Sequence, residues 1–267
     1  MRYSNLHAHT LFSDGKQTPE ENVRAAIEKN MSAIGISDHS YTAFDLCYCI
    51  PENKVGEYLR EMRRLKEKYR EQIPVFIGIE CDGFSTLNDR SAYDYVIGSV
   101  HYIKTAGGYR WVDLSSQAQK QTIEEFFGGD SVAYAKTYFQ TYAECIRRMR
   151  PDVLGHFDLA TKFGHIDEED PQYKNAATET LIAMLEVTPI VELNTGAIAR
   201  GHRKTPYPAP YLIDECQKRG GKFLLSSDSH DHVNLTYWFD EAVALLKSRG
   251  VKSIVELTPT GFEEKGI

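Results

Sequence analysis

The sequence has little of what several protein classes require. Its 267 residues include only five cysteines, an odd number without a C-x-x-C pair, so neither a disulfide framework nor a zinc ribbon is indicated. No apolar run approaches the roughly 18 residues expected of a membrane span. The formal net charge of −7 argues against a nucleic-acid surface, which is usually basic.

The sequence also lacks Pro/Gly/Ser-rich stretches, internal repeats and low-complexity runs, so nothing in it marks a linker. A content of 42% hydrophobic and 26% charged residues suits a globular chain with an ample core. Histidines and acids that could bind metal ions at one site run from His7 to His230. A site drawn from nearly the whole chain implies one domain over residues 1–267. Because His7 already belongs to this site, we expect no cleaved targeting peptide and a cytoplasmic location.

Short β-branched or aliphatic runs predict seven buried strands. These runs lie near 3–6, 33–37, 75–79, 95–100, 152–155, 190–194 and 222–226. Between most of them the spacing is helical: a capping box at Thr18-Pro19-Glu20-Glu21 opens one helix, and Asp130 is expected to cap another through about residue 150. Further helices are predicted over 55–69, 171–187, 208–219 and 238–249. The less regular stretches 84–94 and 102–129 are expected to be loops or short elements over the mouth of the site.

Repeated alternation of strand and helix predicts a parallel α/β sheet. The number of units favours a closed barrel over the alternative, an open doubly wound sheet. In closed barrels of this kind, functional groups gather at the C-terminal ends of the strands. The chemistry-bearing residues of this chain follow its predicted strands, as the barrel prediction requires.

Histidines and acids recur where the predicted strands end. Side chains at positions i and i+2 of a strand point to the same side, so His7 and His9 can reach one ion. Imidazole and carboxylate without thiolate suit zinc, iron or manganese. A bridging carboxylate such as Glu80 is suited to hold two ions that activate one water. The motifs are His7-Ala-His9, Ser37-Asp38-His39, Gly78-Ile79-Glu80, Gly98-Ser99-Val100-His101, Gly155-His156-Phe157-Asp158 and Ser227-Asp228-Ser229-His230.

In this order, the motifs resemble those of the PHP superfamily, named for polymerase and histidinol phosphatase domains. The resemblance spans essentially the full chain. Three further segments look most like the stand-alone histidinol-phosphate phosphatases. They are Val191-Glu-Leu-Asn194-Thr195 followed by Arg200, Tyr207-Pro208-Ala-Pro210, and Asp152-Val-Leu-Gly-His156-Phe-Asp158-Leu.

This resemblance implies a distorted (β/α)7 barrel that holds three divalent metal ions, which would be Zn, Fe or Mn. Asp38 and Asp158 would orient imidazoles from behind. By position, the first ion would be held by His7, His9, Glu80 and Asp228, the second by Glu80, His101 and His156, and the third by Asp14, His39 and His230.

The resemblance also implies an enzyme of histidine biosynthesis that hydrolyses L-histidinol phosphate to L-histidinol and inorganic phosphate. A metal-bridging hydroxide would attack the phosphorus, with Glu80, Asp228 and Arg200 as the catalytic residues. Three divalent ions would outweigh the ligand carboxylates and attract an anion locally, despite the acidic chain. A guanidinium matches phosphate oxygens, so Arg200 is the first candidate for binding phosphate, followed by Lys162 and Arg203.

Histidinol adds an ammonium and an imidazole to the phosphate, so the pocket should offer an acceptor and a flat face. Trp111, Tyr102 and Asp113, in the irregular stretch after His101, are the expected lining residues. His202, in the loop after Arg200, is a further candidate to face the substrate. The oligomeric state cannot be read from the sequence.

Other interpretations remain open from the sequence alone. Another PHP phosphoesterase, acting on nucleotides or phosphodiesters, would share the metal ligands but favour a more basic groove. An amidohydrolase-type barrel also begins with H-x-H, but it would normally need a bridging carboxylated lysine. A non-catalytic metal-binding barrel is less consistent with so many N and O ligands, because structural zinc sites are closed four-ligand sets. The sequence contains no C-x5-R, D-x-D or G-x-x-x-x-G-K-[ST] motif for other routes of phosphate hydrolysis.

Overall fold

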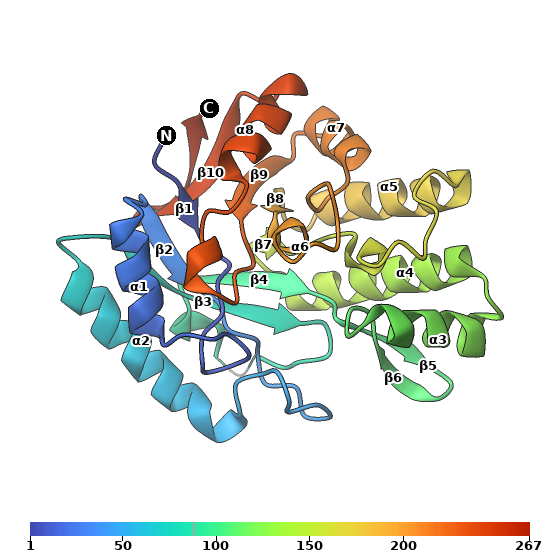
Figure 1. Cartoon of the computed structure of the whole chain (residues 1–267), viewed down its shortest axis with the longest axis horizontal. Coiled ribbons are helices and arrows are strands. Elements are labelled where there is room, and N and C mark those ends of the chain that lie inside the picture. The colour runs from blue at the N-terminus through green and yellow to red at the C-terminus, as the bar shows by residue number, and fades with distance from the viewer. Residues whose placement is uncertain (88) are drawn as a thin grey trace.

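A sheet of seven parallel strands forms the centre of the computed structural model, which describes residues 1–87 and 89–267 (Figure 1). Its strand order is β1-β2-β3-β4-β7-β8-β9. This order follows the chain without a reversal, so the open doubly wound alternative was wrong. The strands are Ser4–Asn5 (β1), Ala33–Ile36 (β2), Val75–Asp82 (β3), Tyr95–Ser99 (β4), Val153–Leu154 (β7), Ile190–Asn194 (β8) and Lys222–Ser226 (β9).

The two edges of this sheet meet and nearly close it into a barrel. Asn5 in β1 donates from Nδ2 to Ser227 Oγ at 2.8 Å, just beyond β9. Ala8 and Ser229 then form a parallel bridge, with His9 N donating to Ser229 O at 2.9 Å. The first and last strands are therefore joined at their C-terminal ends, and the predicted distorted (β/α)7 barrel is confirmed.

Helices surround the strands, as Figure 1 shows. The predicted capping box is confirmed: Glu21 N donates to Thr18 Oγ1 at 3.3 Å, and Thr18 N donates to Glu21 Oε2 at 2.8 Å. Asp130 caps its helix as predicted, accepting from the backbone N–H groups of Val132 and Ala133. The helices are Pro19–Glu28 (α1), Val55–Tyr69 (α2), Ser116–Phe127 (α3), Ser131–Met149 (α4), Pro171–Leu185 (α5), Gly196–Ala199 (α6), Pro210–Lys218 (α7) and Phe239–Ser248 (α8), with 3-10 turns at Glu52–Lys54 (η1), Arg90–Ala92 (η2), Leu159–Thr161 (η3) and His232–Asn234 (η4).

The stretch 102–129 is more regular than the sequence suggested. It forms an antiparallel hairpin of β5 (Tyr102–Thr105) and β6 (Gly108–Trp111), followed by the 12 residues of α3. Between 84 and 94 the structure has the turn η2, and residue 88 lies outside the described residues. A C-terminal hairpin of β10 (Ser253–Thr258) and β11 (Gly261–Gly266) was not predicted at all.

The barrel interior is filled by one hydrophobic cluster, to which the C-terminal hairpin contributes Val255 and Leu257. Tyr95 crosses this interior, and its hydroxyl donates to the carbonyl oxygen of Leu6. Gly35 and Gly78 face the Tyr95 ring so closely that a Cβ at either position would collide with it. Small residues on β2 and β3 thus make room for a large one on β4.

Tyrosines on the outer helices reach the backbone near the strand ends. Tyr142 on α4 donates to Gly155 O at 2.9 Å, and Tyr138 donates to Phe157 O at 3.1 Å. These two carbonyl groups flank His156, which follows the two-residue strand β7. Since so short a strand offers few ladder hydrogen bonds, the helix supplies partners that hold this loop in place.

None of the helices in the described part of the chain combines the length and apolar character that a membrane span requires.

Candidate metal centre

The C-terminal ends of the barrel strands bring together all nine residues that the sequence suggested as metal ligands. Five of the six histidines are buried, and His230 is half-buried. The loop backbone is itself anchored, because Asn22 Nδ2 of α1 donates to His9 O at 3.0 Å. His7 and His9 follow β1, Asp14 lies further along the same loop, His39 follows β2, Glu80 is in β3, His101 follows β4, His156 follows β7, and Asp228 and His230 follow β9.

Glu80 lies at the centre of this cluster, with five histidine nitrogens within 3.5 Å of its carboxylate. Three of the rings approach one carboxylate oxygen and two approach the other. A carboxylate in this position can contribute one oxygen to each of two groups of metal ligands. Oε2 lies 3.2 Å from His7 Nε2, 3.5 Å from His9 Nε2 and 2.9 Å from His39 Nδ1. Oε1 lies 2.8 Å from His156 Nε2 and 3.5 Å from His101 Nε2.

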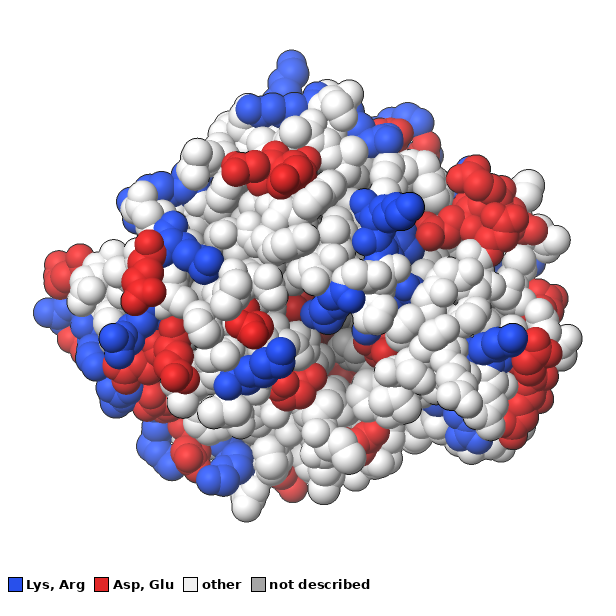
Figure 2. Space-filling model, viewed as in Figure 1, with Lys and Arg blue, Asp and Glu red and all other residues white. Residues whose placement is uncertain are grey.

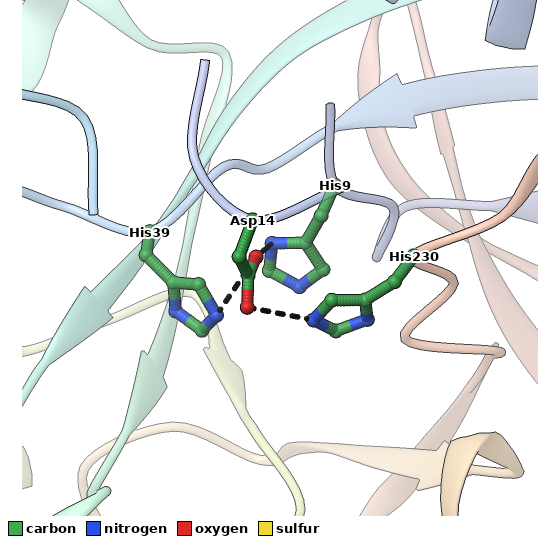
Figure 3. Close-up of side chains that lie close together, drawn as sticks. All are labelled: His9, Asp14, His39 and His230. Carbon is green, nitrogen blue, oxygen red and sulfur yellow. Dashed lines mark hydrogen bonds and ion pairs between the residues drawn. The ribbon is translucent and has the colours of Figure 1, made fainter. Parts of the chain in front are cut away.

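Asp14 joins a second group of histidines at the outer side of the cluster (Figure 3). Its carboxylate lies 3.1 Å from His230 Nε2, 3.7 Å from His39 Nε2 and 3.8 Å from His9 Nδ1. The sequence placed Asp14 with His39 and His230, and the structure adds His9 to them. Three loops that are distant in sequence supply these four side chains.

Asp228 connects the histidine cluster to Arg200. Its Oδ1 lies 3.2 Å from His9 Nε2 and 3.8 Å from His7 Nε2. Its Oδ2 accepts a hydrogen bond from Arg200 Nη2 at 2.9 Å, and its backbone oxygen accepts one from Nη1 at 2.9 Å. Burial would raise the pKa of Asp228, but Arg200 and His7 outweigh it and hold this pKa well below its ordinary value.

Glu80 and His9 are in the protonation states that metal ligands require. Burial would raise the pKa of Glu80, but His39 and His7 outweigh this effect, so its pKa lies well below the ordinary value. Burial, assisted by the neighbouring His230 and His39, lowers the pKa of His9 to about 3. Glu80 therefore stays anionic, and His9 stays neutral with lone pairs available to a metal ion.

Several atoms of the cluster fit divalent metal ions because the protein leaves them without hydrogen bonds. Among the described residues, His7 Nε2, both ring nitrogens of His9, His39 Nδ1 and Glu80 Oε2 are buried and lack a partner of hydrogen-bond geometry. Burying such atoms is costly unless another group satisfies them. Imidazoles and carboxylates without thiolate are suitable ligands for Zn, Fe or Mn. The potential ligand atoms lie within 4.8 Å of one another in three groups: His9, Asp14, His39 and His230; His7, His9 and Glu80; and His39, Glu80 and His101.

These three groups overlap, since His9, His39 and Glu80 each belong to two of them, and their membership differs from the expected one. His39 belongs to two of them, whereas the sequence placed it in the outer group alone. His156, expected beside Glu80 and His101, contacts Glu80 Oε1 without joining a group. The division of the residues among individual ions stays a prediction.

Two buried carboxylates behind the histidines were missed by the sequence reasoning. Glu192 in β8 accepts from His7 Nδ1 at 2.5 Å, and Asp82 in β3 lies 3.2 Å from His101 Nδ1. Each carboxylate holds the far nitrogen of its ring, which turns Nε2 toward Glu80. The available signal was a glutamate inside the apolar run Ile190–Asn194, where the fully buried side chain needs a polar partner.

Asp38 and Asp158 do not orient imidazoles as expected. Asp38 accepts from Thr10 N and Thr10 Oγ1, both at 2.7 Å, and also from the Ser13 hydroxyl. It therefore shapes the loop between His9 and Asp14. Asp158 accepts from the backbone N–H of Ala209 at 3.0 Å, which ties the loop after β7 to the start of α7.

Replacement of Glu192 by glutamine is expected to weaken metal binding by about 10- to 100-fold, as is typical for partners of metal-bound histidines. Glu192 accepts from His7, from Asn194 Nδ2 at 3.0 Å and from His156 N at 2.7 Å, and an amide nitrogen cannot accept from these donors. Metal ions per chain, measured against a competing chelator, would report the change. The matched control is Glu186→Gln, at an exposed position after α5. Equal affinities in the two variants would contradict this role of Glu192.

A cavity of about 310 Å³ opens beside the cluster and presents both cationic and aromatic side chains. This volume is in the range of small-molecule sites, which begin at roughly 300 Å³. Figure 2 shows a hollow near the middle of this face, with basic and acidic side chains at its rim. Outside the metal cluster, the lining residues are Cys47, Tyr48, Trp111, Asp113, Leu114, Leu159, Lys162 and Arg200.

Of the expected substrate contacts, Arg200, Lys162, Trp111 and Asp113 line this cavity, and Arg203, Tyr102 and His202 are not among its lining residues. The Arg203 guanidinium is instead paired with Glu168, at 2.9 Å, and bonded to Thr161. Tyr102 is buried against Trp111, with ring centroids 4.4 Å apart, and donates to Asp45 Oδ2 at 3.0 Å. The His202 ring lies edge-on to Phe163, with their centroids 5.3 Å apart. These three side chains are held by contacts with neighbouring loops instead.

A parallel barrel with histidine and carboxylate ligands at the C-terminal ends of its strands defines a class of barrels built around metal centres. The family model described as PHP domain matches residues 5–196, and the chain belongs to this family. The resemblance seen in the sequence is thereby confirmed.

Individual relatives extend over nearly the whole chain. A protein of Deinococcus radiodurans named "Probable histidinol-phosphatase" is 28% identical over 261 residues, covering 93% of this chain and 94% of the relative. The histidinol-phosphatase of Lactococcus lactis is 23% identical, covering 94% and 92%. A crystal structure of the histidinol phosphate phosphatase from the same organism, in complex with zinc, L-histidinol and phosphate, aligns with a TM-score of 0.69 at 19% identity, covering 98% and 99%.

Proposed function

We propose that this protein is a metal-dependent phosphomonoesterase that hydrolyses L-histidinol phosphate to L-histidinol and inorganic phosphate. The observation that carries the proposal is the cavity. It combines the clustered metal ligands with two basic side chains, Arg200 and Lys162, and an aromatic wall formed by Tyr48 and Trp111. A phosphate, its attacking water and an imidazole ring require these three features. Relatives named histidinol-phosphatase, which align with more than nine-tenths of the chain, support the same substrate.

The protein groups contribute mainly by holding charge in fixed positions. When divalent cations are bound, they lower the pKa of a coordinated water and neutralise charge on the phosphate. Glu80 and Asp228 keep anionic oxygens among the histidines, where they would hold the cations, and Asp228 Oδ1 would accept a hydrogen bond from the attacking water. Since these groups are already oriented and buried, little reorganisation is needed as the phosphorus–oxygen bond breaks.

Arg200 is the residue that we assign to the phosphate itself. Its Nη1 and Nη2 donate to Asp228, Nη1 also lies 3.4 Å from His230 Nδ1, and the side chain helps to line the cavity. Lys162 lines the same cavity, with Nζ held 2.8 Å from Asp113 Oδ2. Two cations beside the metal ligands would attract a phosphate dianion into an otherwise acidic protein.

Replacement of Arg200 by alanine is expected to lower kcat/KM for the phosphate ester by about 100- to 1000-fold, as for the loss of a donor to a developing oxyanion. Arg200→Lys should recover part of this loss, because it keeps the charge but not the planar fork. The measurement is steady-state kinetics at matched metal content. In the control Arg203→Ala, kcat/KM should stay within about threefold while Tm falls, because a largely buried ion pair is broken. Similar kinetic losses in both variants would contradict the distinction between these arginines.

The substrate assignment is tested by kcat/KM on L-histidinol phosphate compared with glycerol phosphate, a nucleoside monophosphate and bis(p-nitrophenyl) phosphate. We expect a preference of about 100-fold or more for histidinol phosphate, because the cavity offers groups that match its ring and charge. A flat profile would leave only a general phosphatase. A preference for the diester or the nucleotide would favour a different PHP phosphoesterase.

We propose further that residues 1–267 form one catalytic domain in the cytoplasm. The cluster supports this organisation because its ligands extend to His230, beyond the 5–196 match of the family model. All five cysteines are free, as expected in a reducing compartment. The net charge of −7 supports a small phosphorylated substrate rather than a nucleic acid.

A further inference from the structure

Asp113, which follows β6, lines the cavity with a carboxylate that the protein satisfies only in part. Lys162 Nζ donates to its Oδ2 at 2.8 Å and to its backbone oxygen at 3.3 Å. Its Oδ1 is buried and has no hydrogen-bond partner within the described ranges 1–87 and 89–267. An ionised carboxylate accepts several hydrogen bonds, so Asp113 retains capacity for a donor that the protein does not supply.

The charge of Asp113 is available to a ligand. Burial would raise its pKa, but Lys162 and His101 outweigh this effect and lower the pKa to about 2. Two other aspartates, Asp14 and Asp228, also line the cavity, and both form close pairs with histidines of the cluster. No such pair with a histidine involves Asp113 among the described residues. Asp113 is therefore anionic at neutral pH and separate from the candidate metal ligands.

The wall beside Asp113 favours a cation attached to an apolar or aromatic body. Trp111 and Tyr48 pack edge to face, with ring centroids 4.7 Å apart and an interplanar angle of 67°. Asp45 fixes this wall by accepting from Trp111 Nε1 at 2.9 Å. Because aromatic faces attract cations and apolar ring atoms alike, the wall and the carboxylate together can recognise an ammonium group close to a flat ring.

We propose that Asp113 is a specificity-determining residue that accepts a hydrogen bond from the ammonium group of a phosphorylated amino alcohol. This inference rests on the proposed function and identifies the residue that recognises the amino group of that substrate. Lys162 holds the carboxylate in place, while Arg200 binds the phosphate on the side of the metal ligands. A neutral phosphate ester leaves Asp113 without its donor, so the site discriminates against it.

The test compares L-histidinol phosphate with 3-(imidazol-4-yl)propyl phosphate, which has the same ring and phosphate but no amino group. Asp113→Asn should lower kcat/KM for histidinol phosphate by about 30-fold, in keeping with a hydrogen bond between charged groups, and change that for the analogue by less than about threefold. If Asp113 only positioned Lys162 against the phosphate, both substrates would lose activity equally. That result would overturn the proposal.

The analogue, measured on the same protein preparation, reports whether the variant is folded and loaded with metal. Asp113→Glu provides a second variant, in which the charge remains but is displaced, and an intermediate loss confined to histidinol phosphate is expected. The matched control is Asp94→Asn, which breaks another aspartate–lysine pair, 2.7 Å from Lys66 and just before β4 at the opposite end of the barrel. It should affect both substrates alike.

Measurements on the wild-type enzyme separate the proposed function from the assignment of Asp113. If it hydrolyses histidinol phosphate no better than glycerol phosphate, the proposed function fails. If it prefers histidinol phosphate to glycerol phosphate but Asp113→Asn keeps the full preference over the analogue, only the assignment of Asp113 fails.

Discussion

Replacement of Glu80 by glutamine is expected to lower kcat/KM by at least about 1000-fold, because the interaction of one residue with several cations is lost. Glu80 is fully buried and approaches histidines through both carboxylate oxygens. Glutamine has nearly the same shape, but its amide nitrogen cannot act as a ligand and leaves the cluster one negative charge short. Steady-state kinetics together with metal ions per chain would measure the effect.

A suitable control for this variant is Glu256→Gln, which removes a carboxylate from the C-terminal hairpin. Glu256 pairs with Lys265 at 3.0 Å, away from the cavity, so this change should leave kcat/KM within about threefold. Circular dichroism would establish that both variants keep the barrel. An active, metal-replete Glu80→Gln or His101→Ala protein would contradict the assignment of the site.

Removal of metal by a chelator is expected to abolish phosphatase activity, with a loss of about 1000-fold or more. The reason is the ligand cluster: its carboxylates and imidazoles can activate a water and neutralise the charge of a phosphate only through a bound cation. Zn, Mn or Fe should restore the activity, with about three ions per chain on elemental analysis. Metal should also raise Tm, because an ion at 1000 times its Kd stabilises the folded state by roughly 4 kcal/mol.

Two controls accompany the chelation experiment: other divalent cations and inorganic phosphate. Magnesium and calcium prefer all-oxygen sites and should restore little activity at a cluster of six imidazoles. Inorganic phosphate, the product, should protect loaded protein from the chelator if it binds beside the ions. Full turnover by protein stripped of metal would contradict the metal-dependent mechanism.

Much of the fold could be predicted because its signals are local. Buried strands show as short aliphatic runs, and the start of α1 shows as the Thr18–Glu21 capping box, which depends on four adjacent residues. Helix α3 was missed because its sequence is largely polar and buries only Gln119, Thr122 and Ile123. Such a helix has little periodicity of its own and is stabilised by the elements around it.

The metal ligands of the candidate site could be predicted from the sequence, but the roles of its arginines could not. The histidine and acid motifs are compact and follow strands, so the parallel arrangement of the strands brings them to one end of the barrel. Arg200 and Arg203 are three residues apart in one loop, and no sequence rule separates a ligand of the cavity from a structural ion pair. The structure separates them, because Arg200 bonds to Asp228 and Arg203 to Glu168.

The sequence by itself determined the donor chemistry, the order of the motifs and thereby the family and the barrel, because these depend on residue identity and short-range spacing. Only the tertiary structure decided which of these groups meet. It closed the barrel between Asn5 and Ser227 and placed Glu192 and Asp82 behind their histidines. It also left one oxygen of Asp113 without a hydrogen-bond partner among the described residues. These arrangements depend on contacts between residues far apart in the chain, and the packing of the whole barrel selects them.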